Sequence, residues 1–417
     1  MNTLLLVSPL LIYFPRLLPG IETQPWLAMG LAAWAFWCDP KFRGASAALG
    51  IVAAACFCIF SLVVIGGVSS GAAMSTLQFA AGPVLLCALV RWQPVPPERR
   101  WCANLALVLA ALALFEIAAP TAYAAVAGTL LDRVSLSDGH RGISLLTPEP
   151  TYASLALAYA LMLSLWSRRC WGGLHWWVEW LLAGLLFLTF STYALLILVT
   201  IIFVYRPLLA LGGLATALLL GYGYLAAGVE AGEGVRAVVA LSKLLEIDRT
   251  AVLASLSIVD PSLGYRATSI AAGPASAVAS PMGFGLGCQS VSQAFDELRW
   301  DFVLTDEVIG PALQDGCLKP SSYMTSILIA YGAMALVFLA VVIVAVRHAL
   351  ARSSRRIWWP GAAVAILILV VQCQVTTPVP WFILYMALVP ARALFLTPSA
   401  QRIFPPIPGH PASAVER

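Results

Sequence analysis

The sequence predicts an all-α protein that lies in a membrane and crosses it with about twelve helices. The chain has 417 residues, of which 61% are hydrophobic and only 11% are charged, and its mean hydropathy is +0.89. A typical water-soluble domain carries about 25% charged residues, so this chain has too much apolar surface for an aqueous fold. The net charge of +4 includes no basic tract, and no nucleic-acid-binding motif is present, so we expect no nucleic-acid partner.

Apolar stretches follow one another along the chain, and each is interpreted as a helix that crosses about 30 Å of hydrocarbon. The first, MNTLLLVSPLLIYFPRLLPG, has neither a basic start nor a small-residue cleavage site, so we expect it to be retained as a helix. The predicted segments are 3–19, 25–38, 46–66, 72–90, 102–119, 151–166, 175–190, 192–205, 208–228, 322–346, 358–376 and 380–397. Several are shorter than a typical membrane-spanning helix, so the number twelve is approximate.

Basic residues occur in alternate connections between these segments. Because positively charged loops stay in the cytoplasm, this pattern predicts that these connections and both termini lie in the cytoplasm. The basic positions are Lys41, Arg43, Arg91, Arg99, Arg100, Arg168, Arg169, Arg206, Arg347, Arg352, Arg355, Arg356 and Arg402.

This topology divides the chain into N-terminal transmembrane helices, a first periplasmic loop, central helices, a large periplasmic loop, C-terminal helices and a cytoplasmic tail. The respective ranges are 1–119, 120–150, 151–228, 229–321, 322–397 and 398–417. The large loop holds eleven acidic and six basic residues, which supports an outside location only weakly because long loops are translocated whatever their charge.

Parts of the large loop are predicted to be helical. The apolar spacing in 234–259 indicates an amphipathic helix, and a second helix is expected from Pro261 or Ser262 to Gly273. The following SPMGFGLG places glycines at alternate positions, which is typical of a tight turn that approaches a partner or ligand closely. Cys288 and Cys317 also lie in this loop, where an oxidising compartment would allow a disulfide.

Only two carboxylates fall within the predicted membrane segments. Glu116 lies near the outer end of its segment, and Glu179 lies near an inner end, four residues after His175 and among tryptophans typical of a membrane interface. An ionisable residue inside a membrane is a candidate for function, so Glu116 is a candidate substrate-binding residue. The sequence lacks the series of mid-membrane charges expected of a proton-coupled transporter.

Most of the other candidate functional residues lie in the two outer loops. Pro148 and Pro150 flank Glu149 just before a helix, where a carboxylate also interacts favourably with the helix dipole, so a purely stabilising role stays open. Arginines bind phosphate in fixed geometry and stay charged at any working pH. A carboxylate among arginines at a bilayer surface suits a lipid-diphosphate substrate and a hydroxyl nucleophile. The accompanying residues are Arg133, His140, Arg141, Arg249 and Arg266.

Four stretches of the sequence carry a family resemblance. The TPEPTYAS stretch, preceded by an arginine and a glycine, resembles the EPS segment that opens a helix in Wzy-type O-antigen and exopolysaccharide polymerases. Its Thr151 stands where the family usually has serine, and the family's arginine-glycine spacings are not clearly met. The other three stretches are SLGYRATSIAAGPASAVASPMGFGLG, similar to the second outer-loop signature, LTFSTYALLIL, similar to a serine-containing helix break, and YMTSILIAYGAMALVFLAVV, similar to the glycine-containing helix that follows.

The resemblance implies a metal-independent glycosyltransferase of the C-type fold, without a cofactor, that polymerises oligosaccharide repeat units carried on undecaprenyl diphosphate at the periplasmic face of the bacterial inner membrane. A chain-length regulator and a flippase would be partners. In that reading Arg141 and Arg266 bind the diphosphate, Glu149 is the general base and His140 the rival base. Arg249, Tyr265 and Tyr152 assist, with Arg133 and Glu116 as further substrate-binding candidates.

Three alternatives stay open. An O-antigen ligase of the same superfamily would transfer the finished polymer to another acceptor, and EPTYAS favours the polymerase. A flippase or transporter of lipid-linked oligosaccharide usually shows inverted repeats and mid-depth polar groups, neither of which is evident. A scaffold for assembly without an active site is the third. Neither the sugars joined nor the kind of polysaccharide follows from the sequence.

Overall fold

The structure is a computed structural model that describes the greater part of the chain. The described residues are 2–11, 30, 70–92, 94–131, 142–171, 176–208, 212, 261–286, 290–298, 321–350, 357–373 and 375–388. Within them the chain forms thirteen α-helices and one short 3-10 helix, and no strand. The all-α fold class is therefore confirmed.

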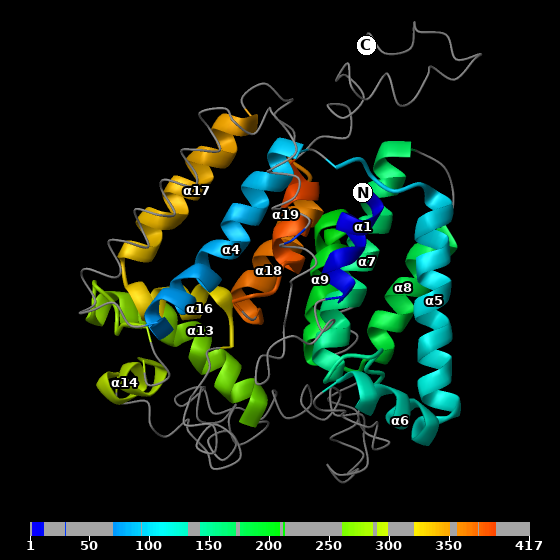
Figure 1. The fold of residues 1–417 in the computed structure, drawn as a ribbon, viewed down its shortest axis with the longest axis horizontal. Coiled ribbons are helices and arrows are strands. Elements are labelled where there is room, and N and C mark those ends of the chain that lie inside the picture. Colours follow the sequence, from blue (N-terminus) through cyan, green and yellow to red (C-terminus); the bar gives the residue numbers. More distant parts are fainter. Residues whose placement is uncertain are drawn as a thin grey trace, which may run out of the picture.

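Long helices packed side by side form the main body of the molecule (Figure 1). Tyr159 Oη, on α7, donates to Leu6 O over 2.7 Å and so attaches the short α1 (Asn2–Val7) and η1 (Ser8–Leu11) to this body. The rings of Tyr159 and Trp166 pack edge-on against aromatic rings of α19. The helices are α4 (Ser70–Trp92), α5 (Arg99–Ala118), α7 (Pro150–Trp171), α8 (Trp176–Leu188), α9 (Thr192–Tyr205), α17 (Met334–Leu350), α18 (Trp359–Val371) and α19 (Val379–Leu388).

Helix α7 lies at the centre of this body. It packs against α5, α8, α9 and α19, and apart from Tyr152 and Ala156 its residues from Thr151 to Ser167 are buried. A helix that is apolar all round and rich in small residues is typical of such a central position, because every face can approach a neighbour. Whatever precedes the first residue of α7 is therefore held by the best-packed element of the fold.

One end of the body, which we call the basic end, gathers the ends of α4, α7, α9 and α19 with the starts of α5, α8 and α18 (Figure 1). Cross-links between these ends include Arg99 Nη2 to Trp171 O at 2.6 Å and Trp358 Nε1 to Tyr205 Oη at 3.2 Å. The basic positions of these segments share this end, as an alternating topology requires. They are Arg99, Arg100, Arg168, Arg169 and Arg206.

The opposite end, which we call the polar end, carries four further helices and several interruptions of helical structure (Figure 1). The helices there are α6 (Pro120–Leu130), α13 (Pro261–Ala279), α14 (Ser290–Glu297) and α16 (Tyr323–Tyr331). The sequence had predicted 120–150 as a loop, but a proline at N1 followed by small residues favours the helix α6.

The predicted membrane segments correspond to helices that are often shorter than expected. Among the described residues, α5 is the single helix that is both long and apolar enough to cross a membrane on its own. The other apolar helical stretches are 10–17 residues long. Helices α8 and α9 match the predicted 175–190 and 192–205 closely, yet at about 1.5 Å per residue each is only about 20 Å long.

The predicted single helix 322–346 is wrong, because the chain breaks at Gly332, whose φ is 57°. The glycine turn after α13 packs against this break: Phe284 N donates to Ile329 O at 2.8 Å, and Ala333 N donates to Pro281 O at 2.9 Å. Gly283 has φ 82°, and a Cβ there would lie 2.1 Å from Ala330 O. The predicted tight turn with close backbone approach is therefore confirmed, and the segment it approaches is the junction of α16 and α17.

Helix α13 begins at Pro261 as predicted but does not end at Gly273. It continues through Pro274 to Ala279, because the alanine-rich residues that follow are good helix formers. A Cβ at Gly273 would lie 3.1 Å from Thr325 Cα, so this glycine serves close packing against α16 and does not terminate the helix.

Candidate functional site

The carboxylate of Glu116, on the last turns of α5, is the centre of the polar end. It is 2% exposed and accepts hydrogen bonds from the next connection in the chain. Ser144 N lies 2.8 Å from Oε1 and 2.9 Å from Oε2, Ser144 Oγ donates to Oε1 at 2.8 Å, and Leu145 N donates to Oε2 at 2.9 Å. The C-terminal end of a helix dipole disfavours a negative charge, so these donors offset an unfavourable position.

The segment that supplies these donors has an unusual backbone. Leu145 and Leu146 both have positive φ, 50° and 57°, a region that residues with a Cβ rarely adopt. Successive N–H groups in such a conformation converge and form a concavity for an anion. The Glu116 carboxylate occupies that concavity, and its charge-assisted hydrogen bonds offset a strain of about 1–3 kcal/mol per residue.

Tyr123, on α6, extends the same hydrogen-bond network. Its Oη lies 2.9 Å from Ser144 Oγ and accepts from Leu146 N at 2.5 Å. Because Ser144 Oγ gives its one hydrogen to Glu116, Tyr123 must be the donor in the contact between the two hydroxyls. Burial raises the pKa of the Tyr123 phenol, an effect partly offset by these hydrogen bonds, so the group keeps the proton that it donates.

Residues 142–149, which we call the anchored segment, end at Glu149, directly before the start of α7. Thr147 Oγ1 donates to Ser144 O at 2.6 Å and to Glu149 O at 2.8 Å, and so closes the turn before the helix. Glu149 O in turn accepts from Tyr152 N and Ala153 N, so Glu149 caps the helix that begins at Pro150. Its side chain is exposed. The expected helix start is confirmed and the carboxylate is open to its surroundings, but the backbone before it is bent and not extended as the flanking prolines predicted.

The break between α8 and α9 holds the same segment from the other side. Ile143 N donates to Leu188 O at 3.1 Å, and a Cβ on Gly142 would lie 2.1 Å from the Thr189 carbonyl carbon. Thr189 Oγ1 is 3.0 Å from Ser154 Oγ on α7, so the break is also attached to the helix that Glu149 caps.

The break itself ends in a helix cap. Phe190 has φ 45°, and Ser191 Oγ accepts from Tyr193 N at 3.3 Å as the N-cap of α9. The serine-containing interruption expected in this stretch is confirmed. Together with the previous contacts, it fixes residues 142–149 between α5, α6 and the break.

A second polar cluster lies where α9, α13, α18 and the start of α16 converge. Tyr193 Oη donates to Gln372 O at 3.2 Å, and Cys373 N donates to Ser321 O at 3.2 Å. Arg266 is a half-buried residue of α13, one of the helices that converge here. Gln372 Oε1 and Ser321 Oγ are buried there without a hydrogen-bond partner in the described part of the chain.

The two tyrosines predicted to assist in substrate binding, Tyr152 and Tyr265, lie in different parts of the polar end. Tyr152 packs with Tyr123, Ala127 and Leu131 under the anchored segment. Tyr265 faces α14, with its ring edge-on to Phe295 at 6.3 Å between centroids. Burial raises the pKa of the Tyr265 phenol.

Other predicted residues lie outside the described part of the chain. They are Arg133, His140, Arg141 and Arg249, with the amphipathic segment 234–259 and the cysteines Cys288 and Cys317. The proposed meeting of Arg141, Arg266 and Glu149 around one substrate therefore stays a prediction.

Sequence reasoning missed Ser144 and Tyr123, the partners of Glu116. Neither belongs to a local motif, and the signal that pointed toward them was the rarity of a carboxylate in an apolar helix. Comparison of the chain with protein-family models, with curated proteins and with solved structures finds no match.

Proposed function

We propose that the chain is a polytopic membrane glycosyltransferase that joins oligosaccharide units carried on a lipid diphosphate, and that it works at its polar end. The membrane placement is supported by the outer faces of the helices, which carry large apolar side chains. Leu114 on α5 is 66% exposed, Phe203 on α9 is 50% exposed and Val344 on α17 is 61% exposed. An apolar surface that extends over several helices suits contact with lipid rather than water.

The orientation follows from the contrast in charge between the two ends. Arginines are concentrated in cytoplasmic connections of membrane proteins, so the basic end is assigned to the cytoplasm. The polar end, with Glu116, Glu149 and the helix breaks, then faces the periplasm. In this placement about twelve segments cross or enter the bilayer, in pairs such as α8 and α9 that turn at short breaks.

The observation that carries the assignment is the anchored segment 142–149, which presents an exposed carboxylate from a rigid support. Glu116, Tyr123 and the break at 188–191 hold this segment from three sides. A catalytic group held within a narrow range of positions lowers the entropic barrier of a bimolecular reaction. A stabilising helix cap would not require this many connections or two strained residues.

The proposed chemistry is transfer of a glycosyl group. Glu149 removes the proton of the acceptor hydroxyl as its oxygen bonds to the anomeric carbon of the donor. The bond from that carbon to the diphosphate breaks, and the lipid diphosphate leaves with the electron pair. Arg266 and Arg141 neutralise its charge, while Arg249, Arg133 and Tyr152 are assigned to substrate binding, with His140 as the rival base.

The second polar cluster supplies groups that suit the sugar itself. Gln372 Oε1 accepts and Ser321 Oγ both donates and accepts, which matches the mixed hydrogen-bonding character of sugar hydroxyls. Arg266 lies on α13, which packs against α18 and α16, so the diphosphate is assigned to α13 and the first sugar to the end of α18.

Charge reversal at Arg266 tests this proposal in a strain that lacks the chromosomal gene. Arg266→Glu is expected to abolish polymer and leave single repeat units on the lipid carrier at the periplasmic face, because the leaving diphosphate loses its counter-charge. Arg206→Glu, an exposed arginine at the basic end, is the matched control and should still make polymer.

The lipid-linked product also separates the alternatives. Normal polymer from Arg266→Glu, at normal protein levels in the membrane, would refute the diphosphate-binding role. Long chains that accumulate on the lipid at the periplasmic face of the deletion strain would identify a ligase, and single units left at the cytoplasmic face would identify a flippase.

A further inference from the structure

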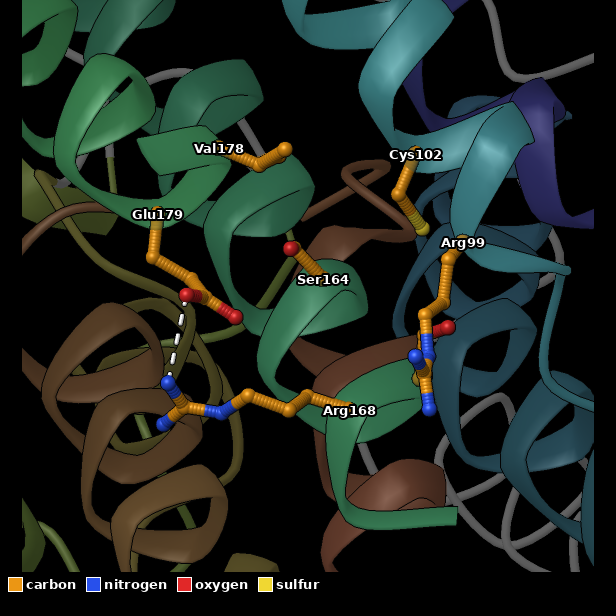
Figure 2. A pocket seen from close by; sticks show the side chains of 7 residues that line it. Arg99, Cys102, Ser164, Arg168, Val178 and Glu179 are labelled. Carbon is orange, nitrogen blue, oxygen red and sulfur yellow. Dashed lines mark hydrogen bonds and ion pairs between the residues drawn. The ribbon is translucent and has the colours of Figure 1, made fainter. Parts of the chain in front are cut away.

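A pocket opens at the basic end between α5, α7 and α8, far along the helices from the anchored segment. Figure 2 shows its polar side chains: Arg99 reaches down from α5, Arg168 and Glu179 meet on the opposite side, and the Ser164 hydroxyl points into the space between. The enclosed part of the space is small, about 20 Å³, and the rest is open to the surroundings. Such a shape suits one end of a larger molecule. The residues that line it are Arg99, Cys102, Ser164, Ser167, Arg168, Val178 and Glu179.

The charges of this pocket do not cancel. Arg168 Nη1 lies 3.2 Å from Glu179 Oε2, and this pair leaves Arg99 without a carboxylate among the lining residues. Helices α5 and α8 begin at this end and contribute positive dipole ends, whereas α7 ends here and contributes a negative one that Arg99 partly neutralises through its hydrogen bond to Trp171 O. The pocket is therefore built to attract an anion.

Two groups in the pocket have hydrogen-bonding capacity to spare. Arg99 Nη2 donates to Trp171 O at 2.6 Å, which fixes the guanidinium, but Nε is buried and has no partner in the described part of the chain. Ser164 is 5% exposed, and its hydroxyl points into the space between Arg99 and the pair of Arg168 and Glu179 (Figure 2). A guanidinium nitrogen and a hydroxyl that face one small space match the oxygens of a phosphate group.

We propose that this pocket binds the phosphate of an anionic phospholipid headgroup in the cytoplasmic leaflet. The source of the phosphate is indicated by the surface around the opening. Trp176, Trp177 and Trp180 are exposed on the first turns of α8, and tryptophans of this kind mark the interface between lipid and water. Basic pockets between transmembrane helices on the cytoplasmic side are well suited to anionic headgroups. The inference rests on the membrane placement proposed above, but not on the glycosyltransferase activity.

The test uses the purified full-length protein in detergent, stripped of lipid and titrated with phosphatidylglycerol under native mass spectrometry. Phosphatidylglycerol is expected to bind more tightly than phosphatidylcholine, and Arg99→Gln to weaken its binding about fivefold, the effect of about one arginine at an anionic lipid surface. Arg100→Gln is the matched control, since it removes the same charge from an exposed neighbour that does not line the pocket.

Several results would overturn the proposal. Equal weakening by Arg99→Gln and Arg100→Gln would mean general attraction to negative charge, and equal binding of the two lipids would mean that the pocket does not select anions. Displacement of phosphatidylglycerol by inorganic phosphate at similar concentrations would assign the site to a free anion. If Arg99→Gln does not fold, Ser164→Ala serves instead and is expected to weaken binding without a change in helix content. Loss of polymer in Arg266→Glu has no bearing on these measurements.

Discussion

The two ends of the molecule use polar residues in opposite ways. At the basic end, charged side chains such as Arg168 are exposed and meet across the surface, and the helices end in regular backbone. At the polar end, the central carboxylate is buried, its partners are mostly main-chain N–H groups, and three non-glycine residues, Leu145, Leu146 and Phe190, have positive φ. The first arrangement tolerates small movements of its parts, whereas the second requires a single backbone conformation.

This difference in rigidity indicates which end can hold a reacting group in a fixed position. A surface ion pair contributes about 0–1 kcal/mol and permits many geometries, so it orients a protein in a membrane without fixing a substrate. A strained segment held by charge-assisted hydrogen bonds keeps its shape only while every partner is present. Substitutions at the two ends should therefore differ in severity far more than their chemical similarity implies.

The largest effect is expected from Glu116→Leu. The substitution removes the acceptor for Ser144 N, Ser144 Oγ and Leu145 N, and it leaves buried N–H groups unpaired in a strained backbone. We expect a loss of about 3 kcal/mol in the free energy of unfolding and a loss of polymer. Denaturant titration of the purified protein in detergent measures the first, and analysis of lipid-linked product in membranes measures the second.

Glu98→Gln is the control, because Glu98 is an exposed carboxylate at the other end of the same helix. It should unfold like the wild type. If Glu116→Leu also unfolded like the wild type, the anchored segment would not depend on this carboxylate, and the contrast between the two ends would disappear.

The distribution of local and long-range contacts explains how much of the fold and of the candidate site could be predicted from the sequence. The start of α7 at Glu-Pro, the break before α9 and the glycine turn after α13 were predicted because each depends on residues within a few positions of one another. The hydrogen bonds to Glu116 were not predicted, since their donors lie 28 and 29 residues further along the chain and no periodic pattern links them to Glu116. Helix α14 was missed because its eight residues are too few for a clear period.

The next largest effect is expected from Gly142→Ala. A Cβ at this position would lie 2.1 Å from the Thr189 carbonyl carbon and 2.4 Å from Leu188 O, and backbone atoms in a helix break cannot rotate away. We expect a loss of about 2 kcal/mol in the free energy of unfolding and a reduced yield of polymer, because the segment before Glu149 must shift. Denaturant titration of the purified variant in detergent, as for Glu116→Leu, measures this loss of stability.

Gly128→Ala provides the matched control for Gly142→Ala. Gly128 lies on an exposed face of α6 with nothing within 4 Å of its added Cβ, so the substitution should stabilise the helix by about 0.5 kcal/mol. Equal behaviour of the two glycine variants would mean that the contact between residue 142 and the break is not maintained in solution.

A smaller effect is expected from Tyr123→Phe. The change removes the oxygen that accepts from Leu146 N, but it leaves Glu116 and its donors in place. The free energy of unfolding should therefore fall by about 1 kcal/mol. Tyr205→Phe removes a comparable hydroxyl, the acceptor for Trp358 Nε1, from a more exposed tyrosine at the basic end. Water can replace that hydroxyl, so Tyr205→Phe should unfold within a few tenths of a kcal/mol of the wild type. A larger loss in Tyr205→Phe than in Tyr123→Phe would reverse the proposed ranking of the two ends.

The smallest effect is expected from the ion pair between Arg168 and Glu179. Their side chains are 44% and 13% exposed, so solvent screens the attraction and the long arginine side chain loses freedom in forming the contact. A double-mutant cycle with Arg168→Gln and Glu179→Gln in lipid-free detergent should give a coupling energy of about 0.5 kcal/mol, which falls as salt is added. A coupling energy as large as the loss in Glu116→Leu would mean that the basic end is as specifically ordered as the polar end. In that case the position of a catalytic group at one end could not be inferred from the rigidity of its surroundings.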